Sequence, residues 1–137
     1  MFVVRVYVAP SSIHGLGCFA AEPIAAGQLV WKFDERVDLR IPLSEYAGFP
    51  PATQDFLQRH TYVERIDGVE YMILCADHSK FVNHSDQPNL LDTPDGLSEY
   101  AACDIAAGEE LTCDYYQSDE KAADKLRVHD PLAQGGP

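Results

Sequence analysis

Basic side chains are scarce in this sequence, which has 10 lysine and arginine residues against 22 aspartate and glutamate residues, a formal net charge of −12. Proteins that bind a nucleic-acid backbone neutralise its phosphates with lysine and arginine, so this balance disfavours direct nucleic-acid binding. An acidic surface instead attracts a basic partner, such as a lysine-rich peptide. The same charge would also serve solubility alone, and composition does not separate these two interpretations.

Long apolar runs are also missing. No stretch approaches the roughly 18 to 20 consecutive apolar residues that a membrane helix requires. Residues 1–5, Met-Phe-Val-Val-Arg, lack the basic start, the long apolar run and the small-residue cleavage site of a signal peptide. We therefore expect a soluble, intracellular protein of the cytoplasm that has no membrane partner.

Closely spaced metal ligands are absent as well. The sequence has four cysteines, none of them in a C-x-x-C pair: Cys18, Cys75, Cys103 and Cys113. A structural zinc site needs close pairs of thiolates, so reduced thiols are expected instead. Asp77, His78 and His84 offer oxygen and nitrogen atoms, but their spacing does not supply a converging ligand set. The sequence predicts no metal site.

What the sequence does contain is a succession of short strand signals. Runs of β-branched and aromatic residues predict strands over residues 2–8, 18–20, 29–33, 62–66, 69–75, 98–105 and 110–116. Pro51 fits the first position of a helix that continues over residues 52–59, and Asp67-Gly68 predicts a hairpin turn. This pattern predicts a mainly β domain over residues 1–118. A polar extension follows over residues 119–137, helical over residues 121–126 and then disordered.

A glycine loop lies near the start of the chain. Residues 15–20, Gly-Leu-Gly-Cys-Phe-Ala, fit the G-x-G-x-x-G/A fingerprint of dinucleotide-binding proteins. That fingerprint needs a helix that begins at the loop, and Pro23 and Gly27 interrupt any such helix. Glycine also lets backbone approach a ligand closely, since it has no side chain. A tight turn between two strands is the alternative explanation of the loop.

Two later segments combine apolar and polar residues. Residues 80–89 read Lys-Phe-Val-Asn-His-Ser-Asp-Gln-Pro-Asn, and residues 106–116 read Ala-Ala-Gly-Glu-Glu-Leu-Thr-Cys-Asp-Tyr-Tyr. In the first, apolar residues run directly into a dense group of hydrogen-bonding side chains. If these side chains are buried, they must be satisfied internally or by a ligand.

The glycine loop and these two segments, in this order, resemble the SET-domain family over roughly residues 3–116. The resemblance implies a β-clip of short curved sheets, in which the C-terminal segment forms a pseudoknot with the Asn-His-Ser segment. It also implies S-adenosylmethionine-dependent methyl transfer to the ε-amino group of a protein lysine. The expected partner is a lysine-containing basic protein or peptide.

The resemblance assigns roles to individual positions. It places Tyr115 as the catalytic tyrosine, and the backbone of His84 at the adenine edge, with its ring as a hydrogen-bonding strut. The implied cofactor-binding residues are Gly15, Leu16, Gly17, Lys80, Phe81, Asn83, His84 and Tyr115, with Asn83 at the methionine end of the cofactor. The implied substrate-channel residues are Phe33, Tyr62, Tyr71 and Cys113.

Two channel positions depart from the family pattern. Cys113 replaces the usual phenylalanine or tyrosine, and the smaller side chain leaves more room around the amine, which favours di- or trimethylation. Phe33 replaces a channel tyrosine, so a hydroxyl that would orient the amine is lost unless Tyr62 or Tyr71 supplies one. No cysteine follows Cys113, so the zinc-binding post-SET segment of some members is not expected.

The lysine channel would then be closed by residues 117–129 or by a second subunit in a homodimer. Two further interpretations stay open. The chain could be a catalytically weak or inactive SET-fold module that binds cofactor or a basic peptide. It could also be a scaffold domain whose acidic face binds basic partners. Failure to bind S-adenosylmethionine would favour the scaffold.

Overall fold

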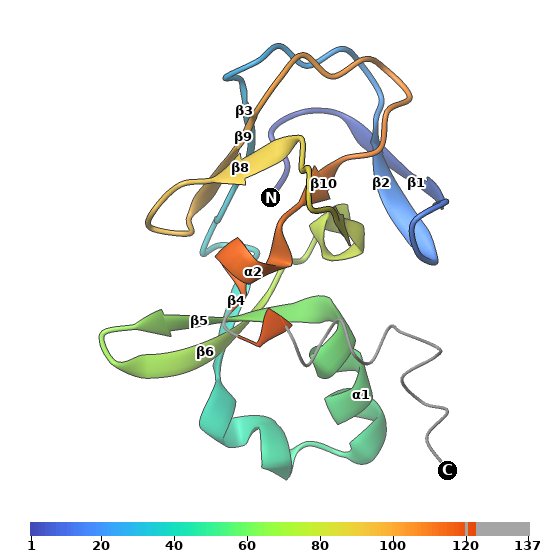
Figure 1. Cartoon of the computed structure of the whole chain (residues 1–137). Coiled ribbons are helices and arrows are strands. Elements are labelled where there is room, and N and C mark those ends of the chain that lie inside the picture. The colour runs from blue at the N-terminus through green and yellow to red at the C-terminus, as the bar shows by residue number, and fades with distance from the viewer. Residues whose placement is uncertain (120, 123–137) are drawn as a thin grey trace.

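The computed structural model describes residues 1–119 and 121–122 of the chain (Figure 1). The first strands are β1 (Val6–Pro10), β2 (Leu16–Ala20), β3 (Leu29–Lys32), β4 (Leu39–Pro42), β5 (Thr61–Ile66) and β6 (Val69–Leu74). The later strands are β7 (Asn83–His84), β8 (Leu90–Asp92), β9 (Ser98–Ala101) and β10 (Thr112–Cys113). The helices are α1 (Pro51–His60), α2 (Tyr115–Ser118) and the 3-10 helices η1 (Leu43–Gly48) and η2 (His78–Phe81).

The strands form small sheets rather than one large one. β1 pairs with β2, the order β3-β9-β8 makes a second sheet, and β4-β6-β5 a third, all of them antiparallel. β7 and β10 form a short parallel pair. Figure 1 shows two tiers, with the β5–β6 hairpin and α1 below and the other sheets above, and with α2 between them. The prediction of a mainly β fold with short helices is confirmed.

The β5–β6 hairpin forms where the sequence predicts it. Asp67 and Gly68 have φ angles of 49° and 81°, the left-handed backbone that a two-residue hairpin turn of the primed type requires. Pro51 begins α1, where its missing N–H costs no helical hydrogen bond. Leu57 is the buried residue of this helix, and it packs with Val63 and Met72 of the hairpin.

Three predicted strands differ from the structure. The strand over residues 110–116 is wrong, because β10 ends at Cys113 and a helical turn follows. Asp114 causes this change, since its side chain accepts a hydrogen bond from the backbone N–H of Tyr116 (3.0 Å), which is an N-cap contact. The strands over residues 2–8 and 98–105 are shorter than predicted, as β1 begins at Val6 and β9 ends at Ala101. Most of the helix predicted over residues 121–126 lies outside the described residues.

The largest buried cluster lies among the upper sheets. It joins residues of β2, β3, β8, β9 and β10 with their flanking loops: Cys18, Ala20, Ile24, Val30, Val82, Leu90, Ala101, Ile105, Leu111 and Cys113. A smaller cluster of Trp31, Ile73 and Cys75 connects the two tiers. The helices of the described residues are all too short or too polar to cross a membrane.

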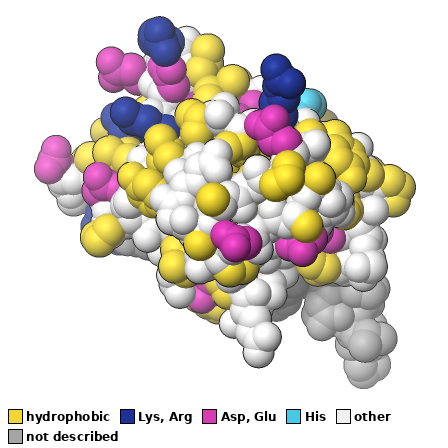
Figure 2. Space-filling view, turned by 90° about the horizontal axis from the view of Figure 1, so that it is seen from above, with side chains coloured by type: hydrophobic (Ala, Val, Ile, Leu, Met, Phe, Trp, Pro, Cys, Tyr) yellow, Lys and Arg dark blue, Asp and Glu magenta, His cyan; other side chains and the backbone are white. Residues whose placement is uncertain are grey.

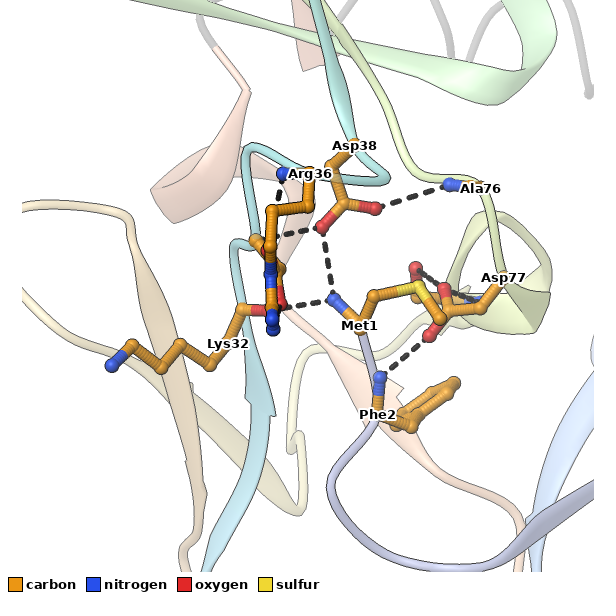
Figure 3. A network of polar contacts seen from close by, with 9 residues as sticks. Met1, Phe2, Lys32, Arg36, Asp38, Ala76 and Asp77 are labelled. Atoms are coloured by element: carbon orange, nitrogen blue, oxygen red, sulfur yellow. Dashed lines mark hydrogen bonds and ion pairs between the residues drawn. The ribbon is translucent and has the colours of Figure 1, made fainter.

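Acidic side chains fix the N-terminal residues beside η2 (Figure 3). The amino group of Met1 contacts Asp38 (3.0 Å), and the backbone N–H of Phe2 donates to Asp77 (2.5 Å). Burial by itself raises the pKa of Asp77, but hydrogen bonds from Ser79 and Phe2 hold this pKa below its ordinary value. Asp77 therefore stays ionised and holds the first turn of η2, from which Ser79 and Lys80 extend toward the site described next.

Candidate functional site

The two polar segments singled out in the sequence lie side by side. Asn83 and His84 of β7 pair in parallel with Thr112 and Cys113 of β10. Asn89 connects the segments a second time, because its Nδ2 donates to the carbonyl of Glu110 (2.8 Å) and its Oδ1 accepts from the N–H of Thr112 (2.8 Å). Both hydrogen-bonding faces of the Asn89 amide are thus used inside the protein.

The Asn83 side chain joins this pair of strands to the glycine loop. Asn83 is buried, and its Nδ2 donates to the carbonyl oxygens of His14 (3.1 Å) and Leu16 (3.1 Å) and to Oε1 of Glu110 (2.9 Å). One amide group therefore sets the position of the loop relative to β7. The donor side of this buried amide is thus satisfied inside the protein.

Glu110 explains why position 17 carries a glycine. Its carboxylate accepts hydrogen bonds from Ser11 Oγ (2.7 and 2.9 Å) and from Asn83. A Cβ atom at Gly17 would lie 2.2 Å from Oε1 of Glu110, inside van der Waals contact. Gly15 has a φ of 47° with open space around it, so its backbone angle rather than crowding favours glycine there.

The His84 ring acts as a hydrogen-bonding strut. Its Nδ1 accepts from the backbone N–H of Tyr115 (3.1 Å), so in the neutral ring the proton lies on Nε2, which faces Asp86 (3.1 Å). The ring also packs against the ring of Tyr115, with 5.4 Å between their centroids. His84 thereby fixes the start of α2.

Tyr115 points back toward the strand pair. Its hydroxyl donates to the carbonyl of Val82 (2.7 Å), and a phenol oxygen can also accept hydrogen bonds through its lone pairs. Burial raises the pKa of Tyr115 above its ordinary value, and the neighbouring Cys113 and Asp119 raise it further. The phenol therefore stays protonated at neutral pH, which suits it to orient a partner and not to act as a base.

A cavity of about 70 Å³ adjoins Tyr115. The lining residues come from both tiers of the fold: Trp31, Tyr62, Cys75, Ser79, Lys80, Val82, Asp92, Gly96, Glu99, Cys113, Tyr115 and Asp119. Burial raises the pKa of Tyr62, and it raises the pKa of Cys75 to about 12, so these two groups are neutral in the working pH range. The cavity is narrow and has aromatic walls on several sides.

The cavity brings together some of the sequence-predicted residues but not others. Tyr62, Cys113 and Lys80 line it with Tyr115, whereas Phe33 and Tyr71 are outside its wall and pack on the cluster around Trp31. The guanidinium of Arg40 lies 4.3 Å from the centroid of the Phe33 ring. Of the remaining predicted positions, Phe81 packs on the main core, and the glycine loop of Gly15, Leu16 and Gly17 lies beside Asn83.

Sequence reasoning missed two acidic residues of the cavity, Asp92 and Glu99. They face each other across the antiparallel β8–β9 pair, on the same side of the sheet as the buried Leu90 and Ala101. The alternation of side chains along a strand was the available signal, because residues two positions apart share a face. Within the described part of the chain, no three His, Cys, Asp or Glu side chains are grouped so as to hold a metal ion.

The facing carboxyl groups predict a pH-dependent stability. Burial, together with Asp92, raises the pKa of Glu99 from 4.5 to about 8. Because the folded protein binds this proton more tightly than the unfolded chain, the resulting stability is fully present below the unfolded pKa and is lost as the pH rises toward 8. Glu99→Gln cannot ionise, so its free energy of unfolding should rise relative to the unsubstituted protein between about pH 5 and 8, by up to about 1.4 kcal/mol per pH unit.

Urea unfolding at several pH values measures this difference, with Glu22→Gln at an exposed position as the control. Parallel stability curves for the unsubstituted protein and Glu99→Gln would contradict the pKa shift of Glu99.

A polar groove adjoins the cavity on its outer side. It has a volume of about 430 Å³ and shares Asp92, Gly96 and Asp119 with the cavity wall. Glu64 and Arg65 of β5 also line it, and Arg65 pairs with Glu70 (3.0 Å). On the separate face seen in Figure 2, acidic side chains are interspersed with hydrophobic ones.

Comparisons with known proteins agree on one family. The SET domain model matches residues 15–116. The chain is 30% identical over 141 residues to a Plasmodium falciparum protein provisionally named histone-lysine N-methyltransferase 1, a match that covers 90% of this chain and 2% of that protein. It is 31% identical over 122 residues to histone-lysine N-methyltransferase SETD1 of Drosophila melanogaster, covering 78% of this chain and 7% of the relative.

Solved structures show the same fold. The crystal structure of a provisionally named histone methyltransferase of Plasmodium falciparum superposes with a TM-score of 0.57 at 21% identity, covering 82% of this chain and 93% of that one. A chain of the Chaetomium thermophilum Polycomb Repressive Complex 2 bound to GSK126 superposes with a TM-score of 0.67 at 21% identity. This match covers 91% of this chain and 17% of that one. The chain spans only a small part of the curated relatives, but the family match covers most of it. This chain belongs to the SET-domain family.

Proposed function

We propose that this protein transfers methyl groups from S-adenosylmethionine to the ε-amino group of a lysine in a protein substrate. One observation carries the proposal: the Tyr115 hydroxyl, fixed on Val82, lines a narrow cavity directly beside the strand that holds Asn83. Membership of the SET-domain family supports the same assignment.

The residues around the glycine loop fit the cofactor. Gly17 has no room for a side chain, and the adjacent carboxylate of Glu110 and the amide of Asn83 are groups that can bind the amino-acid end of S-adenosylmethionine. Gly15, Leu16 and Gly17 would contribute backbone contacts, and His84 would contribute its backbone groups. When bound, the cofactor supplies an electrophilic methyl group on a sulfonium ion.

The cavity would receive the lysine side chain. Free lysine has a pKa of about 10.4, so it must lose a proton before it can attack. Desolvation in a narrow, partly apolar cavity disfavours the ammonium form, whereas the acidic side chains of its wall favour entry of the cation. The aromatic rings of Trp31 and Tyr62 can also accept its charge by cation–π attraction. The oxygen of Tyr115 accepts a hydrogen bond from the amine and so aligns its lone pair.

The adjoining groove supports a basic protein as substrate. Carboxyl groups of Glu64, Asp92 and Asp119 lie along it, and the chain as a whole carries a net charge of −12. Cys113 is smaller than an aromatic residue at the same wall of the cavity, and this is consistent with the addition of more than one methyl group. The relatives named as histone-lysine methyltransferases make histones the first substrates to test.

The function is tested by incubating the full chain with isotopically labelled S-adenosylmethionine, purified histones and a cell lysate. We expect label on lysine side chains, located by mass spectrometry. The affinity for S-adenosylmethionine is measured in parallel by calorimetry. Cofactor binding without label on any protein would support the inactive binding module, and no cofactor binding would support the scaffold.

A further inference from the structure

Asp92 and Glu99 are held in place for the cavity by the β8–β9 ladder. They are direct cross-strand partners, and both line the cavity together with Tyr115. Leu90 and Ala101, two positions away on the same face, are buried in the main core. The core therefore fixes the face of the sheet that carries the two carboxyl groups, and aims them at the same space as the Tyr115 hydroxyl.

This carboxyl pair has no basic partner among the described residues. The ion pairs of the described residues involve Asp34, Asp38, Glu70, Asp86 and Asp114, and not these two groups. Lys80 lines the cavity, but its Nζ donates to the backbone carbonyl of Asp77 (3.1 Å). Two facing carboxylates without a cation repel each other, so the pair keeps one proton, and its remaining carboxylate can accept a second.

The Trp31 side chain is a second, independent indication that the cavity binds a ligand or a water molecule. It is 4% exposed, it lines the same cavity, and its indole Nε1 has no hydrogen-bond partner among the described residues. A buried donor without an acceptor is destabilising, so a ligand or water that accepts from it would be favoured. Trp31 is also the partner of Glu99 in the β3–β9 ladder. A water molecule between them would accept from Nε1 and donate to the carboxyl pair, and the cavity is large enough for one.

We propose that Asp92 and Glu99 together accept the proton that the substrate lysine loses before methyl transfer. This inference rests on the proposed function. An N–H bond of the lysine ammonium breaks, and the proton moves to a carboxylate oxygen of the pair, directly or through a water molecule bound in the cavity. The electron pair of the broken bond stays on nitrogen as the nucleophilic lone pair, and the negative charge of the pair falls by one. Tyr115 cannot take this proton, because its protonated hydroxyl already donates to Val82.

Other titratable and charged groups face the pair, and their titration must be distinguished from that of the two carboxyl groups. The cavity wall contributes Tyr62 from β5, Cys75 after β6, Lys80 from η2, Cys113 from β10, Tyr115 from α2 and Asp119. Glu64 approaches Gly96, and the Met1 amino group, Asp77 and Asp114 act on the pair electrostatically. Burial raises the pKa of Tyr62, Cys75 and Tyr115 above neutrality, so none of these three changes charge in the acidic and neutral range.

The test compares Glu99→Gln and Asp92→Asn with the exposed control Glu22→Gln. General-base catalysis contributes roughly 10²- to 10⁴-fold, so we expect kcat at pH 7 to fall about 100-fold in Asp92→Asn, which loses the carboxylate that is ionised while Glu99 holds the proton, and to change little in the control. The dissociation constant for S-adenosylmethionine should stay within threefold in all variants. The deficit should shrink as the pH rises toward ~10.4, where lysine loses its proton in solution. A structural role would produce no such rescue.

A readout without turnover uses carboxyl-carbon NMR of the unsubstituted protein titrated with Nα-acetyl-lysine methylamide as probe. The protonation midpoint of the pair should shift when this amine binds, and the neutral norleucine analogue should not shift it. Unchanged kcat and pH profile in both variants, or no effect of the amine on the pair, would overturn the inference and leave the proposed function intact. Absence of methyl transfer by the unsubstituted protein would count against the proposed function, and the NMR result would still decide the inference.

Discussion

Replacing Tyr115 by phenylalanine is expected to lower kcat by at least about 100-fold while the protein still folds and binds S-adenosylmethionine. The variant loses the hydroxyl group of a residue that lines the cavity, and in the structure this hydroxyl donates to the carbonyl of Val82. Removing one preorganised hydrogen-bonding group from an active site costs roughly 10²- to 10³-fold in rate. The aromatic ring and its packing against His84 are kept, so the start of α2 should stay in place.

The loss of the hydroxyl should also reduce stability slightly. A single intramolecular hydrogen bond contributes about 1 kcal/mol, and here the Val82 carbonyl loses its donor. Thermal unfolding and calorimetric cofactor titration measure these two quantities, and Tyr100→Phe on the exposed side of β9 serves as the control. Full turnover of Tyr115→Phe on a validated substrate would refute the role given to Tyr115.

The pH dependence separates Tyr115 from the carboxyl pair. A residue that aligns the amine lowers the rate at every pH when it is removed, whereas loss of a proton acceptor is relieved once the solvent removes the proton. Tyr115→Phe should therefore show a deficit that stays constant toward high pH, unlike Asp92→Asn. The two variants together assign orientation and deprotonation to different side chains.

The sequence predicted the hairpin at Asp67-Gly68 and the helix at Pro51 because turn and cap residues act locally. It also predicted that the two polar segments meet, through resemblance to a family rather than through spacing. It failed at α2, where the capping contact of Asp114 outweighs the strand preference of two tyrosines. Residue preferences alone predict one strand over residues 110–116. A satisfied helix terminus stabilises the backbone more than these weak preferences do, so the helix forms instead.

The acidic side of the cavity could not be predicted in the same way. Asp92 and Glu99 flank residues 93–98, a stretch rich in turn residues, and acidic side chains beside such a stretch are ordinarily exposed. Their inward direction depends on the register of β8 with β9, and register is a property of the paired strands rather than of either segment. The orphaned indole of Trp31 also becomes visible only when its surroundings are known.

Asn83→Ala is expected to weaken S-adenosylmethionine binding at least tenfold and to lower the free energy of unfolding by about 2 kcal/mol. The substitution removes the amide that joins the carbonyls of His14 and Leu16 to the carboxylate of Glu110. A buried acceptor left without its donor costs about 1 to 3 kcal/mol. The glycine loop would then lose its fixed distance from β7, and the cofactor contacts predicted for this loop would be lost with it.

Asn89→Ala is the matched control, because it separates cofactor binding from stability. Asn89 also bridges two segments with both faces of its amide, so its loss should destabilise the protein by a similar amount. It makes no contact with the glycine loop in the described residues, and its effect on cofactor affinity should therefore stay within about threefold. Calorimetry and chemical unfolding of both variants give the two quantities independently. An equal loss of cofactor affinity in the two variants would mean that Asn83 acts only through stability, since the Asn83 amide, unlike that of Asn89, donates to the glycine loop and to the carboxylate of Glu110.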